Sequence, residues 1–171
     1  MKKEIKDGKD MKMGAKVSIW TSCALLYALQ VSALLFRLMN TERRLANATY
    51  DMVIGEPNPV ALVGAVIMAL GIILESAADW QKSKQKSVNP NRFCDKGLYK
   101  IVRCPNYLGE MIFWTGVLIS GIGAINGVGQ WIVVLIGYVG IIYVMFSGAR
   151  RLEVRQNKNY GSDPEYQKYV K

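Results

Sequence analysis

Four long blocks of apolar residues, nearly free of charge, constrain this chain more than any other feature. They cover about residues 17–39, 59–78, 106–125 and 130–149 of the 171 residues, without the alternation of a soluble helix or strand. Each block approaches the roughly 20 residues that cross about 30 Å of hydrocarbon. The sequence predicts an all-α polytopic membrane protein with about four transmembrane helices. A soluble bundle is disfavoured, because one domain has little room for four wholly apolar helices.

Basic residues are concentrated in three segments that are separated from one another by two spans each. Most of the 22 Lys and Arg lie in residues 1–16, in residues 79–105 and after residue 149, so all three segments fall on one side. The positive-inside rule makes that side the cytosol, which predicts a plasma-membrane protein with both termini cytosolic. The net charge of +9 therefore reflects topology. No single basic stripe or reader motif indicates nucleic-acid binding.

The chain is expected to form one membrane domain over residues 17–171, after a basic cytosolic tail over residues 1–16. The GEPNP run over residues 55–59 ends any helix before it and prepares the next, which starts at Pro59. Leu98–Val102 is expected to be a short interfacial helix, and residues 150–171 a cytosolic C-terminal helix. Spans three and four form a predicted hairpin whose small residues allow close packing between its arms, with Gly116, Ser120, Gly121 and Gly123 opposite Gly137 and Gly140.

Histidine is absent from the sequence, and the three cysteines, at positions 23, 94 and 104, have no C-x-x-C spacing. This composition argues against zinc and haem, so no metal is expected. It also removes the commonest general acid or base, so any proton chemistry must use Tyr, Glu, Asp or water.

The most informative polar segment is Gly97–Glu110, GLYKIVRCPNYLGE, which runs directly into the apolar sequence MIFWTGVLISGIG. It carries Arg103, Asn106, Tyr107 and Glu110 to the start of a predicted span. Ionisable groups at that depth are costly unless they face a cavity, a ligand or one another, so they indicate a functional site.

Further polar pairs lie at the same predicted boundary. Residues four apart share a helix face, which pairs Glu75 with Asp79, Asn106 with Glu110, and Arg151 with Arg155.

Taken singly, such side chains are often structural: Lys and Arg snorkel to the interface, and the acids of span two could pair with Lys82 or Arg103. Together they predict a site for phosphate or carboxylate, beside apolar spans that suit a lipid-like substrate. A charged cofactor from the cytosol would meet an apolar substrate from the bilayer.

Three segments, ILESAADWQKSKQK, GLYKIVRCPNYLGE and GARRLEVRQNKNYGSDPEYQKY, carry a resemblance over roughly residues 71–171. They resemble the C-terminal domain of the steroid 5-alpha-reductase (3-oxo-5-alpha-steroid 4-dehydrogenase) family and its bacterial relatives. The same superfamily includes the isoprenylcysteine carboxyl methyltransferases.

The resemblance implies an NADPH-dependent reductase of an activated C=C bond in a steroid-like or other lipid enone or enoyl substrate. It implies no residue for the catalytic acid, for which Tyr27, Glu42, Tyr50 and Glu56 are only candidates. The resemblance also implies a set of cofactor contacts, to which we add Arg103 from the same segment. The predicted set is Asp79, Lys86, Arg103, Asn106, Tyr107, Glu110, Arg151 and Arg155.

Two alternatives to the reductase stay open. An S-adenosylmethionine-dependent methyltransferase acting on an isoprenoid, lipid or thiol is expected to have His before the proline, where this chain has Cys104. Cysteine at that position is familiar among the steroid and enoyl reductases, which this chain resembles there. A truncated, non-enzymatic relative is the other alternative, since family members usually have more spans upstream.

Overall fold

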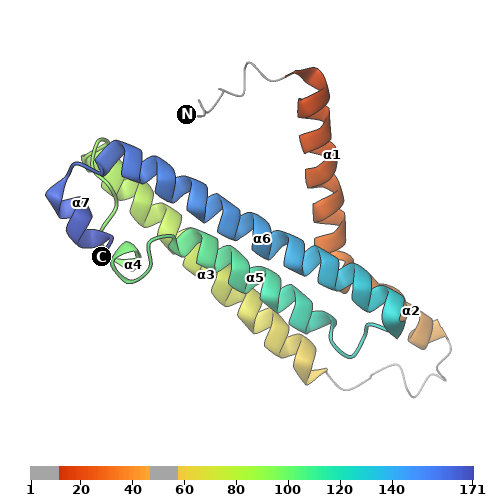
Figure 1. The fold of residues 1–171 in the computed structure, drawn as a ribbon. Helices are drawn as coiled ribbons and strands as arrows, with labels where there is room; N and C mark the ends of the chain where they lie inside the picture. Colours follow the sequence, from red (N-terminus) through yellow and green to blue (C-terminus); the bar gives the residue numbers. More distant parts are fainter. Residues whose placement is uncertain (1–11, 47–57) are drawn as a thin grey trace.

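The computed structural model describes residues 12–46 and 58–171, which are organised entirely by α-helices (Figure 1). Tyr50 and Glu56, two of the catalytic candidates, and most of the predicted N-terminal tail lie outside the described residues. The predicted all-α class is confirmed. The helices are α1 (Met13–Gln30), α2 (Ser32–Ala46), α3 (Pro59–Val88), α4 (Leu98–Ile101), α5 (Pro105–Gly121), α6 (Gly127–Tyr160) and α7 (Pro164–Tyr169).

Helices α3, α5 and α6 run alongside one another, while α1 projects away from them and α4 and α7 gather at one end of the bundle (Figure 1). We call that end, formed by residues 79–105 and 150–171, the polar end. Helix α3 begins at the predicted Pro59, where the Asn58 side chain accepts hydrogen bonds from the backbone N–H groups of Val60 and Ala61. This cap replaces two of the partners that a helix start lacks.

The long helices expose apolar side chains on their outer surfaces. Both α3 and α6 are long and apolar enough to cross a membrane, and α1 with α2 forms a third candidate if the bent pair is one span. Contiguous exposed apolar surface of this extent is what lipid covers in a membrane protein. The chain is therefore an all-α membrane protein. The exposed residues include Leu62, Val63, Val66, Leu70 and Ile73 on α3, and Ile132, Leu135, Ile136 and Val139 on α6.

The third predicted span, over residues 106–125, corresponds to α5, which has 17 residues. That length is at the short end of the range of about 17–25 residues for a spanning helix, so the crossing by α5 stays a prediction.

The first predicted span is not one continuous helix over residues 17–39. Helices α1 and α2 are bent by 44° at Val31, where the Ser32 hydroxyl donates to the Leu29 carbonyl at 2.6 Å. A serine hydroxyl bonded to a carbonyl of the preceding turn competes with the helical ladder and favours a bend.

The bend directs α2 to the C-terminal end of α5. Arg37 Nη1 donates to the Ser120 carbonyl at 2.6 Å, and Asn40 Nδ2 donates to the Ala124 carbonyl. Ser120 lies in the last turn of α5, where carbonyls have no partner within the helix, so Arg37 supplies a missing donor, and Asn40 binds the turn that follows α5. Arg37, the single charge of the first apolar block, therefore has a structural role.

The tightest packing joins α3 to α5 through glycines. A Cβ atom added at Gly64 would lie 2.5 Å from the backbone nitrogen of Ser120 and 2.7 Å from the Gly116 carbonyl oxygen. A Cβ added at Gly71 would lie 2.7 Å from the Gly109 carbonyl oxygen. Small residues seven apart on each helix thus let the two backbones touch, as in close packing of membrane helices.

The predicted glycine packing between the arms of the last hairpin is wrong. Gly116 faces α3, and a Cβ at Gly137 would lie 2.5 Å from the Leu29 carbonyl oxygen of α1. Both sets of glycines do mediate close helix contacts, but each has a different partner from the predicted one, because periodicity identifies a face without identifying what covers it.

At the polar end, α6 continues unbroken to Tyr160, so no boundary separates a span ending at residue 149 from a C-terminal helix over 150–171. After a turn, α7 folds back against the rest of the polar end. The expected short helix is confirmed as α4. Tyr169 OH donates to the Tyr99 carbonyl at 2.7 Å, and the rings of Phe93 and Tyr169 stack with centroids 5.4 Å apart.

Candidate functional site

The site begins where the chain enters α5. Pro105 occupies the first turn, where its missing N–H costs nothing, and Cys104 precedes it in a non-helical conformation. Burial raises the pKa of the Cys104 thiol, so this cysteine is held in its neutral, weakly nucleophilic form. Two residues before α5, Arg103 Nη2 donates to Glu153 Oε1 of α6 at 2.6 Å. This ion pair joins the start of α5 to the polar part of α6.

Tyr107 lies against a glycine of α6. A Cβ atom at Gly148 would lie 3.3 Å from Tyr107 Cε1 and 3.4 Å from its hydroxyl oxygen. Tyr107 is half-buried, and the absence of a side chain at position 148 leaves room for its ring between the helices.

Two clefts flank Tyr107. The first, of about 680 Å³, lies between the start of α5 and α6, and the second, of about 710 Å³, follows α6 outward from Tyr107. Both volumes are within the range of roughly 300–1,000 Å³ that is usual for small-molecule sites. Three residues line both clefts: Tyr107, Ser147 and Arg150.

The two clefts differ in chemistry. The first has a largely apolar wall that includes Leu108, Met111 and Phe146, together with the Arg103–Glu153 pair. The second is lined by three arginines of α6, all exposed: Arg150, Arg151 and Arg155.

These three arginines take part in none of the ion pairs of the described residues, which are Arg92–Asp95, Arg92–Glu165 and Arg103–Glu153. Guanidinium groups bind phosphate and carboxylate through several parallel hydrogen bonds, so the second cleft has the donor set of a polyanion site.

The structure brings four of the eight predicted cofactor residues to these clefts. Arg103 and Tyr107 line the first, and Tyr107, Arg151 and Arg155 line the second. Arg151 and Arg155 lie together because they are one helical turn apart.

The other four predicted residues line neither of these two clefts. Asn106 and Glu110 are half-buried on α5, and Asp79 is exposed on α3. Lys86 holds the polar end together: its Nζ donates to the Pro90 carbonyl at 3.0 Å and to Tyr160 OH at 3.1 Å. The predicted meeting of three helix ends in one pocket therefore holds for α5 and α6, while these two residues of α3 lie outside it.

Carboxylates gather where α3 crosses α5. The backbone of Glu75 packs on Gly109, next to Glu110, and Glu75 interacts electrostatically with both Glu110 and Asp79. The structural alternative, in which Glu75 and Asp79 pair with Lys82 or Arg103, is absent from the ion pairs of the described residues. Within residues 12–46 and 58–171, no group of three or more His, Cys, Asp or Glu is arranged to hold a metal ion.

Sequence reasoning did not single out Ser147, Glu153 or Phe146, which line the first cleft. The partnership of Glu153 with Arg103 spans 50 positions, and no local spacing indicates it. Arg150 stands beside Arg151 in the sequence, but the i, i+4 pattern selects Arg151 and Arg155 and passes over it.

Comparison with known protein families identifies one family that matches the chain. The profile of a family described as "Protein of unknown function (DUF1295)" matches residues 1–171. The chain belongs to the DUF1295 family. No curated protein and no solved structure matches it. For this DUF1295 member, the fold and the two clefts are therefore the basis for an assignment of function.

Proposed function

We propose that this protein is a membrane-embedded reductase that uses NADPH to reduce an activated carbon–carbon double bond in a steroid-like or other lipid enone or enoyl substrate. The observation that carries the proposal is the second cleft, which Arg150, Arg151 and Arg155 line together with Tyr107. The resemblance of the segments around Tyr107 and Arg151 to the steroid 5-alpha-reductases supports the same cofactor.

The charge of the second cleft fits NADPH well. Its three phosphate groups are strongly anionic, and three guanidinium groups that form no ion pair among the described residues would hold them. S-adenosylmethionine, in contrast, carries a sulfonium cation and no phosphate. The same arginines would repel that cation, so the cleft favours the reductase over the methyltransferase.

The first cleft suits the lipid substrate. Its wall includes Tyr143 and Phe146, which are 72% and 63% exposed on the outer surface of α6, where the surrounding medium is lipid. An apolar substrate could therefore move from the bilayer into the cleft without crossing water. Its polar end would face Tyr107 and Ser147, which both clefts share.

This arrangement assigns roles to the chain's own side chains. When bound, NADPH would supply a hydride to one carbon of the double bond, and a proton from water would complete the reduction at the other carbon. Arg151 and Arg155 hold the cofactor's phosphates, and the apolar wall at Met111 and Phe146 excludes water from the reacting groups. The hydroxyls of Tyr107 and Ser147 are placed to donate hydrogen bonds to the substrate carbonyl, where negative charge develops.

The proposal is tested by cofactor binding to the full-length protein in detergent. We expect NADPH to raise the midpoint of thermal unfolding, by mass action on the folded state, and S-adenosylmethionine to leave it unchanged. Replacing Arg151 and Arg155 together by Gln should abolish the NADPH effect. The matched control replaces Lys158 and Lys168 by Gln, which removes two charges from α6 and α7 outside the clefts.

Two results would overturn the assignment. A midpoint raised by S-adenosylmethionine and not by NADPH would establish the methyltransferase alternative. If neither molecule bound to the folded protein, the non-enzymatic alternative would replace both. Where NADPH binds, its oxidation followed at 340 nm with steroid enones and enoyl thioesters identifies the substrate class.

A further inference from the structure

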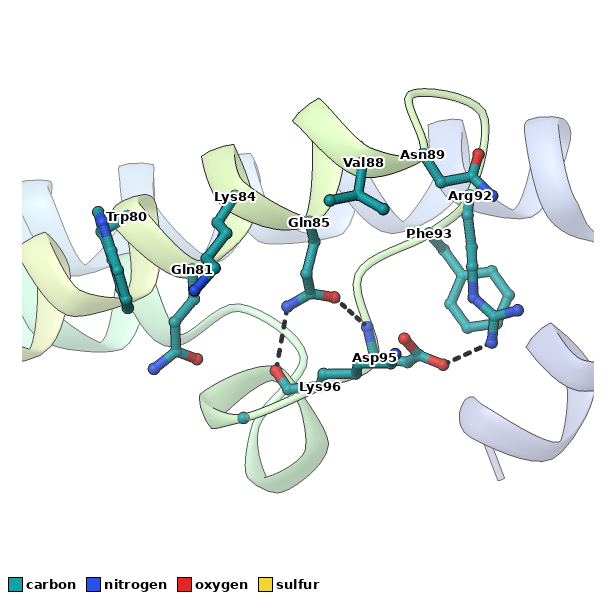
Figure 2. Close-up of a pocket in the computed structure, with 11 residues that line it drawn as sticks. Trp80, Gln81, Lys84, Gln85, Val88, Asn89, Arg92, Phe93, Asp95 and Lys96 are labelled. Atoms are coloured by element: carbon teal, nitrogen blue, oxygen red, sulfur yellow. Dashed lines mark hydrogen bonds and ion pairs between the residues drawn. The ribbon is translucent and has the colours of Figure 1, made fainter.

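A third cleft lies at the polar end, apart from the two that flank Tyr107. It has a volume of about 470 Å³ and lies between the last turns of α3, from Trp80 to Val88, with the C-cap Asn89, and the segment 92–97 that follows (Figure 2).

Specific hydrogen bonds hold this cleft in shape. Gln81 Oε1 accepts a hydrogen bond from the Leu98 backbone N–H at 2.8 Å, and Gln85 Nε2 donates to the Lys96 carbonyl at 3.2 Å. Gly97 has φ of +64°, and a Cβ atom there would collide with Gln81 Oε1. The loop is thus positioned by α3, and a glycine is required at its closest approach.

The interior of the cleft is apolar and open to its surroundings. Trp80 is 63% exposed and Val88 is 83% exposed, both on the α3 wall, while the buried Phe93 belongs to the segment on the other side (Figure 2). Large apolar side chains left exposed together are a usual sign of a binding surface.

Two lysines give the cleft a positive charge. Lys84 Nζ lies 5.1 Å from the centre of the Trp80 ring, and Lys96 is exposed on the opposite wall. The acid of this cleft, Asp95, is bound by Arg92 at 2.8 Å.

Arg92 also binds the nearby Glu165 at 2.8 Å. Among the described residues, none of the ion pairs includes Lys84 or Lys96, so their charge is available to an anion.

The location of the cleft points to the lipid headgroup layer. Trp80 lies two residues after residue 78, where the predicted span ends, which is about 3 Å along the helix axis. Tryptophan and lysine at the end of a span are the residues that usually meet lipid headgroups. Lys86, by contrast, contacts Tyr160 of α6, so the cleft occupies a different face of α3 from Lys86.

We propose that this cleft binds an anionic phospholipid. The phosphate of the headgroup lies between Lys84 and Lys96, and the adjoining acyl carbons cover Trp80 and Val88. Basic pockets beside transmembrane helices bind anionic headgroups in this way, because the bilayer supplies apolar surface and negative charge together. This inference does not depend on the proposed reductase activity.

The test uses native mass spectrometry of the full-length protein in detergent, titrated with phosphatidylglycerol or phosphatidylcholine of identical acyl chains. The wild-type protein is expected to prefer phosphatidylglycerol. Replacing Lys84 and Lys96 together by Gln should weaken its binding by about 30-fold, the effect of two basic groups at a membrane surface, and leave phosphatidylcholine unaffected. Trp80→Ala should weaken both lipids. The control again replaces Lys158 and Lys168 by Gln.

The proposal fails if the Lys84/Lys96 variant binds phosphatidylglycerol as tightly as the control does, or if the wild-type protein does not distinguish the two lipids. It also fails if glycerol phosphate, which has no acyl chain, displaces the lipid at equal concentration, since the apolar wall would then contribute nothing. Thermal unfolding without added lipid verifies that each variant is folded, and NADPH binding should be unchanged in all of them.

Discussion

Arg103 and Glu153 form an ion pair of 2.6 Å that connects the start of α5 to α6, and both side chains line the first cleft. They are 40% and 42% exposed, so the pair is solvent-screened and contributes little to stability. Its main effect is on the site, because Glu153 neutralises a guanidinium group that would otherwise add to the positive charge near Tyr107.

Replacing Glu153 by Gln should therefore separate the two effects. We expect unfolding free energy to fall by less than about 1 kcal/mol, while NADPH affinity rises because a negative charge leaves the first cleft. Glu165→Gln is the matched control, since it also removes an ion pair but lines neither cleft beside Tyr107. Unchanged NADPH affinity in Glu153→Gln, measured by calorimetry, would contradict this account of the clefts.

Glu110 tests whether proximity in sequence to Tyr107 implies a role in binding. Glu110 lies beside Glu75 and lines neither cleft, so Glu110→Gln should relieve repulsion between carboxylates and leave NADPH affinity unchanged. We expect a modest increase in unfolding free energy, of order 0.5 kcal/mol. A selective loss of NADPH affinity in a folded Glu110→Gln protein would return Glu110 to the site.

Gly148 provides a test of the position of Tyr107. A side chain at this residue would contact the Tyr107 ring at 3.3 Å or closer, so Gly148→Val should displace the phenol and lower NADPH affinity at least roughly tenfold, a cost of about 1.4 kcal/mol. Gly129→Val is the control in the same helix, because a Cβ atom at Gly129 has no atom within 4 Å. Equal binding by the two variants would show that Tyr107 does not shape the site.

The contact between α3 and α5 predicts a strong effect on stability. In Gly71→Ala, the new Cβ atom would lie 2.5 Å from the backbone nitrogen of Phe113, so the two helices must separate. We expect a loss of about 1–3 kcal/mol, as for other overpacked interiors. Gly129→Ala, in open space, should gain up to about 1 kcal/mol from helix propensity. Unfolding in mixed detergent measures both, and a neutral Gly71→Ala would refute the close packing.

Alkaline pH should release α7 from the polar end. Burial raises the pKa of Tyr169 to about 12, from the ordinary value of 10.0, and its hydroxyl donates to the Tyr99 carbonyl. The folded state holds the proton more tightly, so the contribution of Tyr169 is complete below pH 10 and is lost between about pH 10 and pH 12.

Proteolysis of the C-terminal segment across this pH range provides the measurement. Tyr169→Phe should be cleaved faster than wild type at neutral pH and show a smaller further increase on alkalinisation. Tyr27→Phe, which removes an exposed phenol from α1, serves as the control. The same pH response in both variants would mean that another group anchors α7.

Much of the architecture follows from local pattern. Long apolar blocks predict the spanning helices, because only hydrogen-bonded helices can place such sequence in lipid. Pro59 and Pro105 mark helix starts correctly, since proline suits the first turn of a helix. The i, i+4 spacing of Arg151 and Arg155 likewise places both guanidinium groups on one side of α6, whatever the rest of the chain does.

Tertiary packing decided the remaining features. The sequence shows that Gly116 lies on a face suited to close contact, but only the folded chain shows that α3 covers that face. Lys86 looked available for a phosphate until the fold brought Tyr160 beside it, 74 positions away. Helical periodicity records which residues share a side of one element. The partner of that side depends on the relative positions of elements far apart in sequence, which no local spacing encodes.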